Sequence, residues 1–348
     1  MIGELLPDQP ALDNPGVLQA KNVTPYAQGY RPTRNLVPQT DALTGPCKGA
    51  ALLQSATGVI YNYAGDATDI YTRTGDSWTS VQNGYTLGDD DRWAFDRWYD
   101  TVLAVNGVDK LQVGDFNGTM ADADTAAPIG RHIAVARNFV MVGNLIENNQ
   151  GTAPIADAAG VSWSALGDPT KWDIEVSGEQ GFQHLDGSGE VTGIFGGEYF
   201  TICMQGGIYR ANPVGPPAQF QFDQVMPNRP VPYSGAIVQV GYGIYFLSYD
   251  GFYMFDGNTA HPISSGKMSK AFFNDFDRDA ASVMTAEADL ENNLIYFAYP
   301  GQGHQSGICN RAYVYNYVTG LWTGPIEQDT QQLIYSRTPG VLADSLDD

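Results

Sequence analysis

Residues 244–257 read Ile-Tyr-Phe-Leu-Ser-Tyr-Asp-Gly-Phe-Tyr-Met-Phe-Asp-Gly. Aromatic and aliphatic residues fill two short runs, and this composition is typical of β-strands. Tyr249-Asp250-Gly251 separates the two runs, and glycine supplies the positive φ that a tight hairpin turn requires. A second Asp-Gly pair, Asp256-Gly257, follows the second run. The stretch therefore predicts a β-hairpin with another turn directly behind it.

The same pattern extends over most of the chain. From about residue 51 onward, short β-rich runs alternate with Gly, Asn and Asp turns, and the best helical candidate is one short segment near Lys267 to Phe276. This mixture predicts an all-β fold. Further predicted strands are Val59–Tyr63, Asp69–Arg73, Thr101–Val105, His132–Val135, Phe139–Val142, Leu294–Ala298, Ala312–Tyr317 and Leu321–Thr323.

The spacing of these strands indicates how they are organised. The β-rich clusters recur at intervals of roughly 35 to 60 residues, which brackets the repeat length of propeller blades. A single four-stranded blade cannot bury both of its faces, whereas a ring of blades can. We therefore predict a β-propeller of about six blades over residues 51–348, with two packed β-sandwiches as the alternative.

The first fifty residues differ in composition from the rest. They contain seven prolines, and proline fixes φ and lacks the N–H that a strand ladder needs. Residues 1–50 are therefore predicted to form an extended, proline-rich N-terminal arm that contacts neighbouring subunits. Residues 51–348 form the propeller domain in this prediction.

Charge and hydropathy exclude several classes of protein. The chain has 348 residues, with 18 Lys plus Arg against 39 Asp plus Glu, and its net charge is −21. Tight DNA binding depends on Lys and Arg that neutralise phosphates, so a protein that grips DNA is excluded. The sequence contains no run of 18 apolar residues, and its first residues do not form a secretory signal. We expect a soluble protein that is made in a cytoplasm and has no membrane partner.

Three polar motifs are similar in composition to ligand-binding loops. Asp275–Asp279 resembles the start of a calcium loop, but Ala280 and Ala286 stand where an EF-hand needs Gly and Glu. Asp89-Asp90-Asp91 is interpreted as an exposed loop. Gly187-Ser188-Gly189 with Gly193 has the wrong spacing for a phosphate-binding fingerprint and is interpreted as a hairpin turn. No metal or cofactor site is predicted.

No catalytic site is predicted either, and the chain is not expected to be an enzyme. The histidines and cysteines are far apart in sequence and lack zinc-ligand or disulfide spacing. A carboxylate pair for glycoside hydrolysis would be sought at Asp186 and Glu190, near Trp163 and Trp172. The dispersed residues are His132, His184, His261, His304, Cys47, Cys203 and Cys309.

An ordered set of short strings resembles a known family. The set comprises Asp13–Val23, Gly29–Pro32, Trp163–Trp172, Gly193–Tyr199, Ile208–Arg210, Phe220–Asp223, Gly251–Gly257 and Tyr315–Trp322. Taken together, these strings resemble structural tail proteins of tailed bacteriophages, especially the hub or nozzle proteins of short-tailed phages. The resemblance implies a β-propeller subunit in a hexameric ring on the genome exit path. It implies no enzymatic residues.

The expected function follows from this resemblance. The ring would lie below the portal and adaptor, contact them and other tail proteins, and retain and then release the genome. It would be assembled in the host bacterial cytoplasm and reside in the virion tail. DNA would pass without specific binding, because Asp and Glu at lumen-facing positions would repel its phosphates. Two alternatives remain: a tail-associated propeller that binds or degrades glycans, and a cellular protein-binding propeller.

Overall fold

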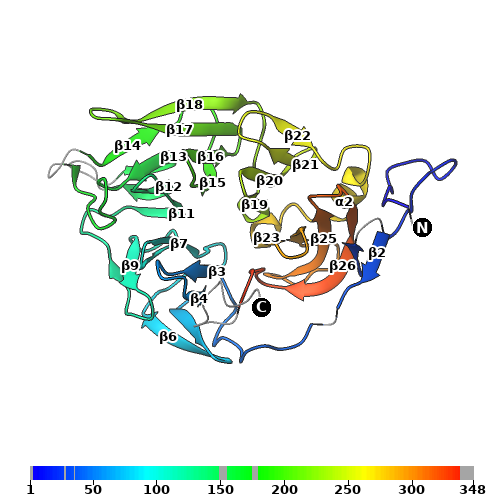
Figure 1. Ribbon diagram of the computed structural model, residues 1–348, viewed down its shortest axis with the longest axis horizontal. Coiled ribbons are helices and arrows are strands. Elements are labelled where there is room, and N and C mark those ends of the chain that lie inside the picture. The colour runs from blue at the N-terminus through cyan, green and yellow to red at the C-terminus, as the bar shows by residue number, and fades with distance from the viewer. Residues whose placement is uncertain (1–2, 27–28, 35, 149–154, 175–178, 338–348) are drawn as a thin grey trace. The chain divides into compact units, whose positions relative to one another are not determined.

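The structure is a computed structural model that describes residues 3–26, 29–34, 36–148, 155–174 and 179–337. Within these ranges, six four-stranded antiparallel sheets form a six-bladed β-propeller arrangement, which confirms the all-β prediction. In every sheet the strands lie side by side in chain order, so each blade is a simple meander (Figure 1).

The chain divides into two compact units. Unit 1 comprises Met1–Val37 and Val231–Tyr335, and unit 2 comprises Pro38–Pro230 and Ser336–Asp348. Unit 2 contains blades 1 to 4, and unit 1 contains blades 5 and 6 with a separate two-stranded sheet and a short helix.

The strands of unit 2 are β3 (Gly49–Gln54), β4 (Ile60–Gly65), β5 (Asp69–Thr74) and β6 (Ser77–Asn83) in blade 1; β7 (Ala94–Trp98), β8 (Thr101–Val105), β9 (Gln112–Asp115) and β10 (Ala121–Asp122) in blade 2; β11 (Ile129–Ala136), β12 (Phe139–Asn148), β13 (Ile155–Trp163) and β14 (Gly181–His184) in blade 3; and β15 (Val191–Phe195), β16 (Phe200–Met204), β17 (Gly207–Gly215) and β18 (Gln219–Pro227) in blade 4.

In unit 1, the separate two-stranded sheet consists of β1 (Val23–Tyr26) and β2 (Gly29–Pro32). Blade 5 consists of β19 (Ile237–Val240), β20 (Gly243–Ser248), β21 (Gly251–Phe255) and β22 (Ala260–Pro262), and blade 6 consists of β23 (Thr285–Asp289), β24 (Leu294–Tyr299), β25 (Cys309–Asn316) and β26 (Trp322–Thr330). The helix α2 (Ser269–Asp275) lies between the two blades in sequence, and two 3₁₀ turns span Ser234–Ala236 and Ala281–Val283.

The core of unit 2 lies between successive blades, and strand β8 shows why. Side chains along a strand point alternately to its two faces. Val102 and Ala104 join the apolar cluster between blades 1 and 2, whereas Leu103 and Val105 join the cluster between blades 2 and 3. Both faces of the blade are therefore buried, which explains why Thr101–Val105 is apolar without alternation.

The core of unit 1 is richer in aromatic residues. One cluster joins blades 5 and 6, helix α2 and the N-terminal segment, and it includes the buried rings of Phe252, Phe272 and Trp322. Leu5 of the N-terminal segment belongs to this cluster and is only 1% exposed. The segment is thus part of the hydrophobic core of unit 1.

The N-terminal region contains more regular structure than an extended arm. Strands β1 and β2 form an antiparallel pair that packs on β26 and β25 of the same chain, and Ala20 bridges to Gly324. The first blade strand begins at Gly49. The expected contact of this arm with neighbouring subunits stays a prediction.

Most predicted elements are found where the sequence indicated them. The hairpin around Tyr249-Asp250 joins β20 to β21, and the predicted helical segment contains α2. Gly320, with φ of 73°, lies in the turn between β25 and β26, where a residue with a Cβ would be strained.

Candidate functional site

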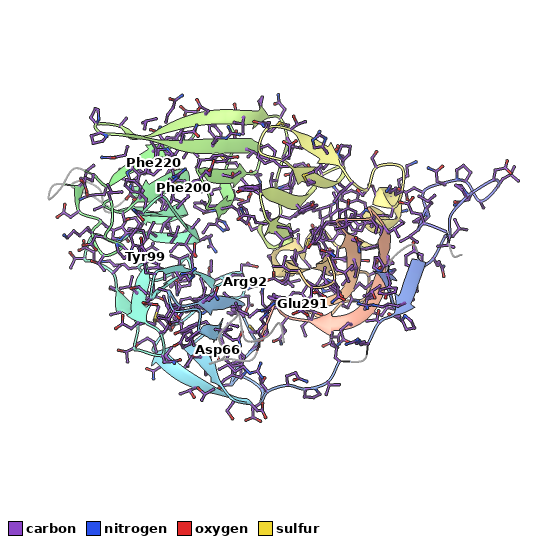
Figure 2. The ribbon with its side chains drawn as sticks, viewed as in Figure 1. Asp66, Arg92, Tyr99, Phe200, Phe220 and Glu291 are labelled. Atoms are coloured by element: carbon purple, nitrogen blue, oxygen red, sulfur yellow. The ribbon has the colours of Figure 1, made fainter. Side chains whose placement is uncertain are left out.

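A groove lies between two turns of neighbouring blades in unit 2. One turn joins β7 to β8 and the other joins β11 to β12. The groove has a volume of about 340 Å³, and we call it the blade 2–3 groove. Figure 2 labels Tyr99, which lies between the sheets of these two blades. The lining residues are Asp96, Arg97, Trp98, Tyr99, Val135, Ala136, Arg137 and Asn138.

Two of these residues have an unusual backbone conformation. Tyr99 and Arg137 both have φ of 49°, in the left-handed region. Ten non-glycine residues of the described chain have positive φ, and the other eight are Asn, Asp or Gln. Asn and Asp tolerate this conformation, whereas other side chains are strained by about 1–2 kcal/mol. Two of the three positive-φ residues that are neither Asn nor Asp therefore line the same groove, and the third, Gln219, begins β18.

The side chains at the rim support one another. The rings of Trp98 and Tyr99 meet edge to face at a centroid distance of 5.5 Å, and the Tyr99 hydroxyl donates to Asn138 Oδ1 across the groove at 3.4 Å. Arg97 Nη1 donates to the Tyr99 carbonyl at 3.4 Å, and Arg137 Nε donates to the Glu198 carbonyl at 3.0 Å. Two guanidinium groups are thus held at the rim of the groove.

Asp96 connects the two strands on which these turns are built. Its Oδ2 accepts the Val135 N–H of β11 at 2.8 Å, and its Oδ1 accepts the Arg97 N–H at 2.7 Å. Burial raises the pKa of Asp96 to about 6, although these two N–H donors act in the opposite direction. Asp96 therefore ties β7 of blade 2 to β11 of blade 3.

The chemistry of the groove favours binding. Its lining includes no serine, cysteine, lysine or histidine, and the Asp96 carboxylate is occupied by two backbone N–H groups. Guanidinium groups, an exposed aromatic ring and an amide are groups that recognise a polar or anionic molecule. The sequence reasoning missed this site. A signal for it was present, because a two-residue connection between strands forces Arg137 into a turn that normally requires Asn or Gly.

The four histidines, which are dispersed in the sequence, do not form a common site in the structure. His184 lies between Asp157, at 2.8 Å from Nδ1, and Asp186, at 3.3 Å from Nε2. His261 and His304 each face one aspartate, Asp256 and Asp277, at 3.0 and 3.2 Å. His132 lies on β11, where burial and the adjacent Arg131 lower its pKa to about 4.

The acidic motifs have structural partners. Asp275 forms an ion pair with Arg311 and accepts the Tyr299 hydroxyl at 2.8 Å, so it joins α2 to blade 6. Asp91 pairs with Arg131 of blade 3 at 3.1 Å. Within the described ranges, no group of three or more His, Cys, Asp or Glu residues is arranged to hold a metal ion.

The tryptophans near Asp186 and Glu190 are not available for stacking on a sugar. Trp163 and Trp172 are buried, and their indole N–H groups donate to the carbonyls of Glu179 and Pro169. The interpretation of Gly187-Ser188-Gly189 as a hairpin turn is wrong. These residues connect β14 to β15, which belong to different blades, and the connection bends at two positive-φ glycines.

The first strands of the blades carry few charged residues. Within each unit these strands lie beside one another, β3 to β7, β11 and β15 in unit 2 and β19 to β23 in unit 1. They carry three acids, Asp96, Glu287 and Asp289, and two arginines, Arg97 and Arg131. Most acids lie in turns and connections, where they are readily solvated. The predicted enrichment of acids at lumen-facing positions concerns the channel of the ring of subunits and stays a prediction.

Two further findings concern the chain as a whole. Cys47, Cys203 and Cys309 are not joined in a disulfide within the described part of the chain, and the last two are buried. Among the described residues, no helix has both the length and the apolar character that crossing a bilayer requires.

Comparison with known proteins identifies the fold. No protein-family model matches the sequence, and no curated protein matches it. The extracellular domain of the hybrid two-component system BT4673 from B. thetaiotaomicron is similar with a TM-score of 0.52 and 13% identity, over 85% of this chain and 35% of that one. The chain thus spans about a third of the length of that structure.

Two other similar structures are the computationally designed Ika8 protein, with a TM-score of 0.46 and 14% identity over 86% of this chain and 93% of that one, and the Neurospora crassa Pan2 WD40 domain, with a TM-score of 0.45 and 8% identity over 84% and 80%. At such identities a structural likeness concerns the fold and says nothing about function.

Proposed function

We propose that the chain is a non-catalytic structural subunit of a bacteriophage tail, of the hub or nozzle type. In this proposal, copies of the chain form a hexameric ring that contacts the portal or adaptor protein and other tail proteins. The ring forms part of the DNA exit channel, retains the genome in the virion and then releases it.

The observation that carries the proposal is the ordered set of sequence strings that resembles such tail proteins. The six-bladed propeller is the fold that this resemblance implies. Residues of these strings occupy core positions of the blades, such as the fully buried Trp172, Phe252 and Trp322. The strings therefore describe a scaffold, as expected for a structural subunit.

Exposed apolar residues in the N-terminal region support a contact with a neighbouring subunit. Leu36 and Val37 are 73% and 67% exposed, and Leu12 is also exposed. The nearby segment from Leu5 to Asp8 is docked on the blades of its own chain. Because the same region is anchored at one place and apolar at another, it is suited to bridging two subunits.

Passage of DNA without tight binding depends here on a scarcity of cations. The chain has 18 Lys plus Arg against 39 Asp plus Glu. Since phosphate binding scales with the number of cations that neutralise DNA, a channel wall built from this chain would provide little affinity. The net charge of −21 acts in the same direction over longer distances.

The proposal is tested on the purified full-length protein by light scattering and electron microscopy, together with antibody labelling of tailed phage particles. We expect rings, and label at the tail. Leu36→Asp should shift the mass toward the monomer, whereas Val214→Asp, an equally polar change at an exposed position of β17, should not. A protein that is monomeric at every concentration and labels no particle contradicts the proposal.

A further inference from the structure

The blade 2–3 groove is lined by two residues that have a strained backbone conformation and a side chain able to bind a ligand. Natural turns at such positions are commonly built from Asn or Gly, which take a positive φ at little cost. Tyr99 and Arg137 stand there instead, one in each turn, and both side chains line the groove. Strain that persists at two facing residues points to a role that their side chains perform.

We propose that the blade 2–3 groove binds a sugar that carries a carboxylate, such as a hexuronic acid unit. Arg97 and Arg137 recognise the carboxylate, and Tyr99 packs against the sugar ring. Asn138 offers an amide to the hydroxyl groups. This inference gives a ligand to the glycan-binding alternative and does not depend on the ring-subunit proposal.

The charge balance of the groove favours an anion. The whole chain has more than twice as many acids as bases, yet the groove is lined by two arginines and a single carboxylate. Both oxygens of that carboxylate, Asp96, already accept backbone N–H groups. Two acids flank the groove: Asp100 accepts the Ala56 N–H at 2.8 Å, and Glu198 lies 4.0 Å from Arg137.

The shape of the groove favours a sugar over a bare inorganic anion. Its volume of about 340 Å³ lies at the small end of ligand-binding pockets and suits one sugar ring with its substituents. Tyr99 is 61% exposed, and an edge-to-face contact with Trp98 holds its ring orientation. An exposed aromatic ring with a fixed orientation offers an apolar face beside polar groups, which matches the two kinds of surface on a sugar.

The test measures binding of D-glucuronate to the full-length protein by calorimetry or ligand-observed NMR, with D-glucose and acetate as comparison ligands. Arg97→Gln and Arg137→Asn should each weaken glucuronate binding by about ten-fold or more, the usual effect of losing a charge-assisted hydrogen bond. Arg278→Gln removes the same charge from an arginine that packs over Phe273 in unit 1, and it should leave binding unchanged.

Arg137→Asn separates a loss of binding from a loss of folding. Asn tolerates the positive φ at this position better than Arg does, so the variant should have a thermal midpoint at or above that of the wild type while it loses the ligand. Tyr99→Asn should behave in the same way.

Four results would overturn the proposal: no glucuronate binding, equal binding of glucose, equal binding of acetate, or wild-type affinity in both arginine variants. No glucuronate binding, or wild-type affinity in both arginine variants, would show that the groove is not the binding site. Equal binding of glucose would show that the carboxylate is not recognised, and equal binding of acetate would show that the sugar ring is not recognised.

Discussion

Units 1 and 2 join their neighbouring blades in different ways. In unit 1 the rings of Phe252, Phe272 and Tyr299 follow one another at centroid distances of 4.9 Å, and helix α2 and the N-terminal segment complete the cluster. In unit 2 the clusters between blades 2, 3 and 4 are accompanied by polar side chains that reach from one blade to the next. Asp96 accepts the Val135 N–H at 2.8 Å, and Asn144 donates to the Val191 carbonyl at 2.8 Å.

This difference indicates which contacts between blades depend on pH. Burial of aromatic surface does not change with pH, whereas a buried titratable side chain couples folding to protonation. We therefore expect the contacts between blades of unit 1 to be insensitive to pH and those of unit 2 to respond to it.

The largest effect is expected in the aromatic cluster. Phe272 is fully buried and contacts five aromatic rings, so Phe272→Ala should lower the free energy of unfolding by about 3–5 kcal/mol. Urea denaturation measures the loss, and amide hydrogen exchange should locate it in residues 231–335. Tyr242→Ala, at an 88% exposed position of the same unit, is the control and should have little effect. Equal losses in the two variants would contradict the role of the cluster.

The next effect concerns His132 of unit 2. Its pKa is lowered to about 4 in the fold, so the unfolded chain takes up a proton near pH 6.5 that the folded chain does not. The stability is therefore present above pH 6.5 and is lost as the pH falls toward 4, by on the order of 3 kcal/mol. His132→Gln should flatten this part of the profile, measured by urea denaturation at several pH values.

His184 provides the matched control for that experiment. The hydrogen bond that His184 donates to Asp157 raises the pKa of His184, so its contribution has the opposite sign and is lost as the pH rises through that pKa. His184→Gln should therefore leave the acid loss of stability in place. A His132→Gln profile that is as steep as the wild type would show that His132 does not cause the loss.

Over the same pH range, the titration of Asp96 should change the free energy of unfolding in the opposite direction to that of His132. Because burial raises its pKa to about 6, the fold favours the protonated form, and stability falls as the pH rises from about 4 to about 6. The effect is on the order of 2 kcal/mol. Asp96→Asn keeps one of the two acceptor oxygens and removes the titration. The stability of the wild type relative to the variant should therefore be higher at pH 4.5 than at pH 7, and a constant difference would contradict this assignment.

The sequence was sufficient to predict the repeated architecture. Turns such as Tyr249-Asp250-Gly251 and Thr319-Gly320 are local signals, because the backbone of a tight turn constrains the residue type. Runs such as Thr101–Val105 likewise reveal strands with two buried faces. The number of blades follows from how often these local signals recur.

The sequence was not sufficient for features that depend on distant contacts. Nothing around Asp96 or His132 distinguishes them from surface residues, since their burial arises from a neighbouring blade. The same holds for Asp8, whose partners lie more than 260 residues away. The blade 2–3 groove requires two turns that are separated in sequence, so neither turn alone predicts it.

The smallest effect is expected in unit 1, for the contact between its N-terminal segment and helix α2. Asp8 accepts the N–H groups of Lys270 and Ala271 at 2.8 and 3.0 Å, and these lie in the first turn of α2. Met268, directly before the helix, makes no such side-chain bond, so the helix is capped from the other end of the chain. Asp8→Ala should cost about 1 kcal/mol, whereas Asp8→Asn should retain most of the stability, because Asn caps helices about as well as Asp.

Amide hydrogen exchange at Lys270 and Ala271 provides the direct measurement. In Asp8→Ala both amides lose their acceptor and should exchange about five-fold faster, since a loss of about 1 kcal/mol in local stability corresponds to a factor of that size. Unchanged exchange in Asp8→Ala would contradict the capping of α2 by Asp8.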